Sequence, residues 1–308
     1  MYANEGVVEA RKKVMLKEEK SSLWKQSLRG LLKNKLAVAG FVFMLMMFFA
    51  CFIGPLFSPY ADNKINMADM KQAPSSEHWL GTDSLGRDVL TRVLQAGRIS
   101  LTVGLASMAL SVAIGAALGA VAGYYRGIAD QIIMRLADLL LTIPGLPLLF
   151  IFGALLSEWK IPTDYRMYIV MLMLSVVGWP GIARMVRSQI LSLREREFMQ
   201  ATVVLGLRDR RKLFGHMLPN VTPLLIVIST LSIGGAILSE SVLSFFGLGV
   251  MAPTPTWGNM IDAANNIIDY EQHPWLWIPP GLCIFTTVIA INLFGDGLRD
   301  VLDPRINR

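Results

Sequence analysis

Six runs of mostly apolar residues divide this chain, and each is about long enough to cross a bilayer. A helix needs about 20 such residues to span the hydrocarbon core. We predict membrane spans at residues 36–57, 101–123, 134–156, 168–185, 221–245 and 278–293. Of the 308 residues, 53% are hydrophobic and 17% are charged, whereas a soluble domain has about 25% charged residues. The expected fold class is therefore an all-α integral membrane protein with six transmembrane helices, located in the plasma membrane.

The positions of the basic residues predict how the chain is oriented. Most of the 29 Lys and Arg residues lie before residue 36, near 126–135, in 186–219 and after residue 298. Cytoplasmic segments of membrane proteins carry such an excess. We therefore predict a cytoplasmic N-terminal tail at 1–35, an extracytoplasmic segment at 58–97 and a cytoplasmic C-terminal tail at 298–308. The net charge of +6 fits this orientation. We expect contact with membrane lipid and none with nucleic acid.

One face of the second predicted span carries small residues at intervals of four. They are Ser107, Ser111, Gly115, Gly119 and Gly123. Residues four apart lie on the same side of a helix, and small side chains let membrane helices approach closely. We favour packing of this face against another helix of the same chain. The alternative is a subunit interface or a surface that slides during gating.

Three residues inside the predicted spans are candidates for a transport pathway or gate. Pro144, together with Pro147, is expected to break or kink the third span. Broken helices can line a pathway, but prolines also occur in ordinary membrane helices. Glu240 and Asn292 are polar residues within apolar runs. A charged group in the membrane is a functional candidate, although Glu240 is near the end of its span and can instead reach the interface.

Motifs for enzyme chemistry are missing from the sequence. There is no Gly-x-x-x-x-Gly-Lys-Ser/Thr phosphate loop, so this chain is not expected to hydrolyse ATP. The histidines, which are His78, His216 and His273, are far apart in sequence, so we expect no metal site. Cys51 and Cys283 lie inside apolar runs and are interpreted as buried hydrophobic residues. We expect no catalytic residue and no cofactor.

The segment before the second span is expected to contain a helix of its own. Thr82 or Asp83 can cap the start of this helix through its side-chain oxygen. The apolar residues Leu85, Val89 and Val93 are then expected to lie on the membrane surface.

The most informative segment is the predicted cytoplasmic loop at about 186–219. Its sequence Ser192-Leu193-Arg194-Glu195 predicts a helix start. Apolar residues then recur at helical spacing until Gly206 interrupts them. A second apolar face follows and is expected to end at Pro219. The segment is either an amphipathic helix at the membrane surface or a docking element that fits a groove on a partner protein.

This loop resembles the ATPase-coupling loop of binding-protein-dependent ABC importer permeases, whose pattern is Glu-Ala-Ala, then Gly, then Leu-Pro. The matching residues are Gln200, Ala201, Thr202, Gly206, Leu218 and Pro219. Gln200 replaces the usual Glu, which keeps the size but removes the charge, and Thr202 replaces the second Ala. The resemblance implies that the loop enters a groove on an ATPase subunit. The change at Gln200 leaves no carboxylate for a salt bridge at that position.

Further segments are similar to the dipeptide and oligopeptide branch of this family, in its second or C-type permease subunit. They are residues 78–88 (HWLGTDSLGRD), 97–101 (GRISL), 243–258 (LSFFGLGVMAPTPTWG) and 295–305 (GDGLRDVLDPR). The resemblance implies a type I ABC importer permease fold, with residues 98–297 as its core. It also implies partners, namely a homologous second permease subunit, two cytoplasmic ATPase subunits and an extracytoplasmic peptide-binding protein.

A self-contained secondary carrier or channel is the alternative that the residues leave open. Such proteins often have inverted internal repeats and midplane charges, and this sequence shows no such repeat and few such charges. An intramembrane enzyme would need a catalytic set, which is missing. The resemblance implies peptide import, and relatives of this type carry dipeptides, longer peptides, nickel chelates or other small solutes.

Overall fold

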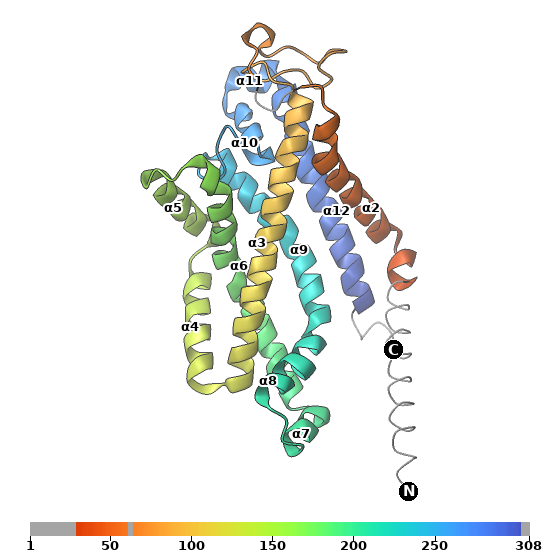
Figure 1. The fold of residues 1–308 in the computed structure, drawn as a ribbon, viewed down its shortest axis with the longest axis vertical. Helices are drawn as coiled ribbons and strands as arrows, with labels where there is room; N and C mark the ends of the chain where they lie inside the picture. Colours follow the sequence, from red (N-terminus) through yellow and green to blue (C-terminus); the bar gives the residue numbers. More distant parts are fainter. Residues whose placement is uncertain (1–28, 61–63, 303–308) are drawn as a thin grey trace.

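The computed structural model describes residues 29–60 and 64–302, and the predicted tails lie partly outside them, at 1–28 and 303–308. Five helices are long and apolar enough to cross a membrane (Figure 1). They are α2 (Lys35–Ile53, continued by η1, Gly54–Phe57), α3 (Val89–Tyr125), α6 (Thr163–Arg194), α9 (Leu218–Phe245) and α12 (Ile278–Leu302). The described residues form no β-strand. The predicted all-α membrane fold is therefore confirmed.

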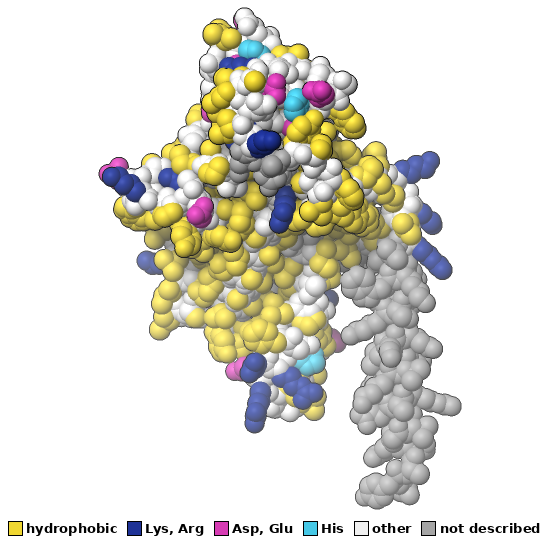
Figure 2. Space-filling view, turned by 45° about the horizontal axis from the view of Figure 1, so that its top comes forward, with side chains coloured by type: hydrophobic (Ala, Val, Ile, Leu, Met, Phe, Trp, Pro, Cys, Tyr) yellow, Lys and Arg dark blue, Asp and Glu magenta, His cyan; other side chains and the backbone are white. Residues whose placement is uncertain are grey.

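Shorter helices connect these five at both ends of the molecule. At one end, α7 (Glu197–Val204), α8 (Asp209–Arg211) and η3 (Lys212–Met217) lead from α6 to α9. At the opposite end, the chain passes from α9 to α12 through α10 (Trp257–Ile261), η4 (Asp262–Asn265), α11 (Ile267–Gln272) and η5 (Pro274–Leu276), and η2 (Met67–Asp69) precedes α3 (Figure 1). Figure 2 shows hydrophobic side chains in a broad belt around the middle of the molecule, with most charged side chains towards its ends. This distribution suits a protein that crosses a bilayer.

The third predicted span is not one helix but two, α4 (Gly127–Thr142) and α5 (Gly145–Glu158), which are bent by 88°. Pro144 stands directly before α5 with ψ near 132°, a backbone conformation that cannot continue a helix. Because a proline also disfavours the helical conformation in the residue before it, the chain leaves α4 at Ile143. The break that the prolines predicted is therefore present.

The direction of α6 indicates that this broken pair still carries the chain across the membrane. Gly115 of α3 lies against Ile182 of α6, and Gly123 lies against Ile190, so the two helices are parallel. The chain must therefore return from the Tyr125 end to the Thr163 end before α6 begins. Only α4 and α5 are available for this return (Figure 1). If the pair is counted as one span, the described residues contain six spans, as predicted.

The small residues of the second span pack against α6. Ser107, Ser111 and the three glycines on the same face are all buried. A Cβ atom on Gly119 would overlap the carbonyl oxygen of Ala183, and one on Gly115 would lie 2.7 Å from the Cβ of Ile182. The carbonyl of Ser107 accepts hydrogen bonds from Ser111 at 2.8 Å and from Ser175 of α6 at 3.1 Å. In this structure the face serves packing within the chain, which is the interpretation that the sequence favoured.

Several helices extend beyond their predicted spans because polar residues continue them outside the apolar core. Helix α6 continues past residue 185 to Arg194, and it contains the buried Pro180. Helix α12 continues past residue 293 to Leu302, so part of the predicted C-terminal tail is helical. Hydropathy marks only the part of a helix that lies in hydrocarbon, which explains the difference.

The separate helix predicted before the second span, capped by Thr82 or Asp83, is not present, and the chain enters α3 directly. Asp88, rather than Thr82 or Asp83, caps α3, and its carboxylate accepts a hydrogen bond from the backbone N–H of Thr91 at 2.8 Å. Val89 and Val93 are buried rather than placed on a membrane surface. Asp83 instead binds the N–H groups of its own turn. Asp83 lies five residues before Asp88, and the local pattern did not distinguish which aspartate caps the helix.

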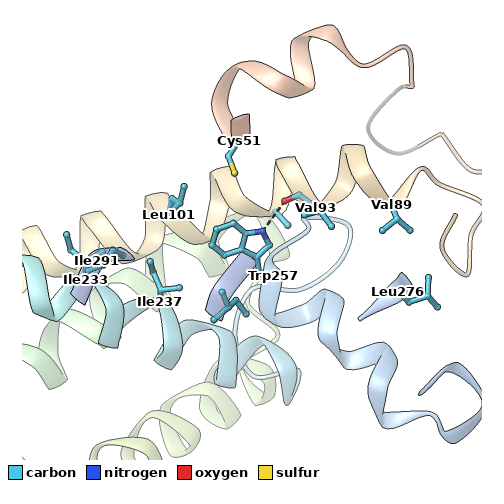
Figure 3. Packing of buried hydrophobic residues seen from close by; sticks show 11 residues of the cluster. Cys51, Val89, Val93, Leu101, Ile233, Ile237, Trp257, Leu276 and Ile291 are labelled. Carbon is cyan, nitrogen blue, oxygen red and sulfur yellow. Dashed lines mark hydrogen bonds between the residues drawn. The ribbon is translucent and has the colours of Figure 1, made fainter. Parts of the chain in front are cut away.

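A buried tryptophan joins the connection between α9 and α12 to the long helices (Figure 3). Trp257 of α10 is completely buried, and its indole N–H donates to the carbonyl of Val93 at 3.0 Å. Gly97 of α3 gives it room, because a Cβ there would lie 2.6 Å from the indole ring and would overlap the sulfur of Cys51. The cluster therefore connects α2, α3 and α10.

We predict that Gly119→Ala destabilises the protein, whereas Gly181→Ala on α6 does not. The added methyl group at position 119 meets the backbone of α6, and overpacking of this kind costs about 1–3 kcal/mol. At Gly181 no atom lies within 4 Å of an added Cβ. Thermal unfolding of both purified variants in the same detergent measures the difference. Equal melting temperatures would contradict the role given to this face.

Candidate functional site

The connection between α6 and α9 is largely helical, and its start differs from the prediction. Ser192, Leu193 and Arg194 form the last turn of α6, so the predicted helix start at this point is wrong. Helix α7 begins at Glu197, after Arg196, which provides no side-chain cap. The spacing of Ser192 and Glu195 also occurs along a continuous helix, where residues three apart are neighbours. A capping pattern therefore cannot separate a helix start from a helix end.

Gly206 follows α7 in a left-handed conformation, with φ of +65°. Glycine adopts this conformation without the steric cost that a side chain brings. No atom lies within 4 Å of a Cβ built on Gly206, so backbone conformation rather than space favours glycine here.

The second half of the predicted loop is continuous with the fifth span. The segment Asp209–Phe245 is one helical span that includes α8, the π-helix η3 and α9. The expected end at Pro219 is therefore wrong, because Pro219 lies in the first turn of α9. A π-helical turn changes the hydrogen-bond register, and η3 ends two residues before Pro219, which lacks an N–H group. Leu218 is half-buried and Pro219 is exposed.

Helix α7 presents an apolar surface to solvent. Val203, Val204 and Leu205 have exposed fractions of 61%, 87% and 75%. Gln200 and Ala201 are also exposed. We call these five residues the α7 surface.

The inner side of α7 holds it against the bundle. Met199 and Thr202 are buried, and the hydroxyl of Thr202 donates to the carbonyl of Met199 at 2.6 Å. Met199 packs in a cluster with Leu213 and Met217 of η3. The amide of Gln200 donates to the carbonyl of Glu195 at 3.3 Å. The short helix therefore has one anchored side and one free side.

Three polar residues, Tyr124, Arg194 and Asp209, fix this connection to the end of α3, and no sequence motif indicates them. The hydroxyl of Tyr124 donates to Asp209 at 2.5 Å, and Arg194 donates to the carbonyl of Tyr124 at 2.9 Å. They border a cavity of about 330 Å³ between α3, α7 and η3. Tyr124 and Asp209 are 85 positions apart. No local motif can reveal such a contact.

The three candidates for a pathway or gate lie apart from one another in the fold. Pro144 is exposed at the break between α4 and α5, and Asn292 is exposed on α12 beside Gly234 of α9. Glu240 is completely buried. Its carboxylate accepts hydrogen bonds from Ser100 of α3 at 3.0 Å and from Ser244 at 2.7 Å. In this structure Glu240 connects α3 to α9.

The described residues offer no group of three His, Cys, Asp or Glu side chains that could hold a metal ion. His78 pairs instead with Asp88, at 3.0 Å. Cys51 and Cys283 are free thiols, one buried and one half-buried.

Comparisons with known proteins match nearly the whole chain. Residues 115–308 match the family described as "Binding-protein-dependent transport system inner membrane component", and residues 22–74 match "N-terminal TM domain of oligopeptide transport permease C". A putative peptide permease protein of Brucella suis is 41% identical over 274 residues, which cover 89% of this chain and 88% of the relative.

Two relatives with more specific names are similar over an equal extent. The oligopeptide transport system permease protein OppC of Bacillus subtilis is 35% identical, over 93% of this chain and 91% of its own length. The dipeptide transport system permease protein DppC of Alkalihalophilus pseudofirmus is 36% identical, over 92% and 91%. Together with the helical membrane fold, these matches identify a multi-pass plasma membrane protein. The chain belongs to the family of binding-protein-dependent ABC importer permeases, in its oligopeptide and dipeptide permease C branch.

Proposed function

We propose that this chain is one permease subunit of an ATP-driven importer that moves dipeptides or oligopeptides across the plasma membrane by alternating access. The observation that carries the proposal is the α7 surface, an exposed apolar patch on a short helix between two long membrane helices. Exposed apolar residues on such a helix are typical of a helix-in-groove contact. The partner would be a cytoplasmic ATPase subunit. A second ATPase subunit, identical or homologous to the first, would bind the other permease subunit.

The coupling loop in this proposal comprises Gln200, Ala201, Thr202, Gly206, Leu218 and Pro219, within about 186–219. The N-terminal tail, this loop and the C-terminal tail would face the cytoplasm, as the basic residues indicate. Residues 58–97 and the connection between α9 and α12 would then face outward. An extracytoplasmic peptide-binding protein would dock on that side, and a homologous second permease subunit would complete the pathway.

The mechanism follows from how α7 is attached. Closure of an ATP-bound ATPase pair would move α7, and α6 and α9 would move with it because they join α7 through short connections. ATP can shift the transporter between inward- and outward-facing states only if it binds the two states with different affinity. The permease subunit itself would hydrolyse nothing. The alternative, a self-contained carrier, gives no role to an exposed α7 surface.

Val204→Asp is expected to disrupt the ATPase contact without unfolding the permease. The side chain is 87% exposed in this chain alone, so a charge there costs little until a partner covers it. A charge buried without a partner at the centre of an interface is costly, so we expect binding to weaken by at least about tenfold. Quantitative mass spectrometry of the tagged protein, gently purified from membranes, measures how much ATPase accompanies it.

The matched control is Ile267→Asp on α11, where the isoleucine is 72% exposed at the opposite end of the molecule. We expect this variant to retain its ATPase. A wild-type protein that moves solute in liposomes with no ATPase attached would refute the importer proposal and support the secondary carrier.

Gly206→Val is expected to abolish ATP-driven uptake while membrane insertion remains normal, and Gly206→Asn is expected to retain uptake. A β-branched residue is strained at a φ of +65°, whereas asparagine tolerates the left-handed region. ATP-driven uptake into right-side-out membrane vesicles and the amount of inserted protein are measured in the same preparation. Equal activity of the two variants would show that the conformation of Gly206 does not matter.

Tyr124→Phe is expected to loosen the attachment of the coupling loop. The substitution removes only the hydroxyl that donates to Asp209, so hydrogen exchange in residues 197–212 should rise about two- to fivefold. Tyr125→Phe is the control, because its side chain is 57% exposed and its hydroxyl makes no hydrogen bond within the described part of the chain. The same exchange rate in both variants would contradict this anchoring role.

A further inference from the structure

The outer end of the molecule contains a cavity that the coupling mechanism does not use. It has a volume of about 810 Å³ and lies between the turn before α3, the end of α9 and the connection from α10 to α11. Small-molecule sites are commonly cavities of about 300–1,000 Å³. The apolar part of its lining includes Val89, Phe245, Met251, Met260 and Leu276.

One part of the lining carries an unbalanced positive charge. Arg87 and Arg92 both bind the carboxylate of Asp83, with Arg87 at 2.8 Å and Arg92 at 3.3 Å. The other oxygen of Asp83 already accepts the backbone N–H groups of Leu85 and Arg87. Two guanidinium groups therefore share one carboxylate whose acceptor positions are filled.

Arg92 is the less well satisfied of the two arginines. It is 6% exposed, and its Nη1 atom has no hydrogen-bond partner among the described residues. A buried hydrogen-bond donor without a partner is unfavourable, and a guanidinium group presents a fork of donors that matches a carboxylate. Arg87 and Arg92 therefore give this part of the lining more guanidinium donors than the carboxylate of Asp83 can accept.

Another part of the lining carries an unbalanced negative charge. Asp262 of η4 is exposed and accepts a hydrogen bond from Asn265 at 2.7 Å. None of the described Lys, Arg or His residues forms an ion pair with it, whereas Asp269, which also lines the cavity, pairs with Lys71 at 2.6 Å. A ligand with a carboxylate, an ammonium group and apolar side chains would match the cationic, anionic and apolar parts of this lining.

We propose that this outer cavity is a subsite for the translocated peptide, in which Arg92 and Arg87 receive its C-terminal carboxylate and Asp262 receives its N-terminal ammonium group. The inference rests on the proposed function, because only an importer would bring peptides to this side. It adds a position on the permease itself where a peptide is held after the binding protein releases it. A cavity of this size favours a short peptide over a protein surface.

The test uses the complex isolated from native membranes with its co-purifying subunits and reconstituted in liposomes. Uptake is compared for a labelled tripeptide and its C-terminal amide, with wild type and Arg92→Gln. For each complex we divide the uptake of the free tripeptide by that of its amide. The binding protein's own preference is the same in wild type and Arg92→Gln, so it cancels when these two ratios are compared. We expect Arg92→Gln to reduce the preference for the free carboxylate about tenfold and to leave the amide nearly unchanged.

Arg166→Gln is the matched control. Arg166 is 4% exposed on α6 and also has nitrogen atoms without partners, but it does not line the cavity. It should change both peptides equally. A corresponding comparison of Asp262→Asn with free and N-acetylated tripeptides tests the ammonium position. Because Asp262 is exposed, we expect this substitution to leave folding unchanged.

A measurement on the wild-type complex covers the case in which Arg92→Gln fails to assemble. A tripeptide with a benzophenone side chain is photo-crosslinked during turnover, and we expect attachment at Met251 or Met260 that excess free tripeptide suppresses and its amide does not. Crosslinks confined to other sites, or equal losses for acid and amide, would overturn the subsite. Wild type that imports neither peptide with ATP would instead overturn the proposed function.

Discussion

Helix α3 can lie against α6 at backbone distance only because its contact positions carry glycine and serine. In a bilayer the apolar residues of a helix gain little by leaving lipid, so helix association depends on close packing and on hydrogen bonds between helices. Gly115, Gly119 and Gly123 allow the close packing, and the carbonyl of Ser107 accepts the hydrogen bond from α6. The other spans are placed relative to this pair, because α9 and α2 also pack on α3 and α4 packs on α6, while α12 packs on α2 and α9.

The end of the molecule that holds α10 and α11 is joined to the same helix by polar contacts. Ser100 of α3 donates to Glu240 of α9 and accepts from the backbone of Trp257. One serine thus joins two spans to the connection between α9 and α12, and the carboxylate of Glu240 has hydroxyl partners although it lies among apolar helices. A buried carboxylate that is hydrogen-bonded in this way specifies one arrangement of its neighbours more strictly than apolar contact does. The outer cavity is formed by elements that this junction positions.

Sequence reasoning identified what depends on local composition and missed what depends on distant contacts. The spans, the small face of α3 and the break at Pro144 follow from hydropathy, four-residue spacing and the geometry of proline. The cap predicted at Thr82 or Asp83 and the helix start predicted at Ser192 were wrong, because residues that can cap a helix also occur in turns and within continuous helices. The contact of Tyr124 with Asp209, and the sharing of Asp83 by two arginines, exist only after the chain is folded. The family resemblance indicated the α7 segment, but only the structure shows which of its side chains are free.

Pro180 gives α6 a mechanical property that its length alone would not suggest. The helix is 32 residues long, or about 48 Å, and runs from the edge of the outer cavity at Thr163 to within three residues of α7. A helix of this length can couple a movement on one side of the membrane to the other side. Proline cannot donate to the carbonyl of Val176, so the helix is most easily bent at that level. Both parts of α6 are held against α3, the part before the proline through the hydrogen bond of Ser175 to Ser107 and the part after it through Gly119 and Gly123. A bend of α6 at Pro180 would therefore have to move α3 with it.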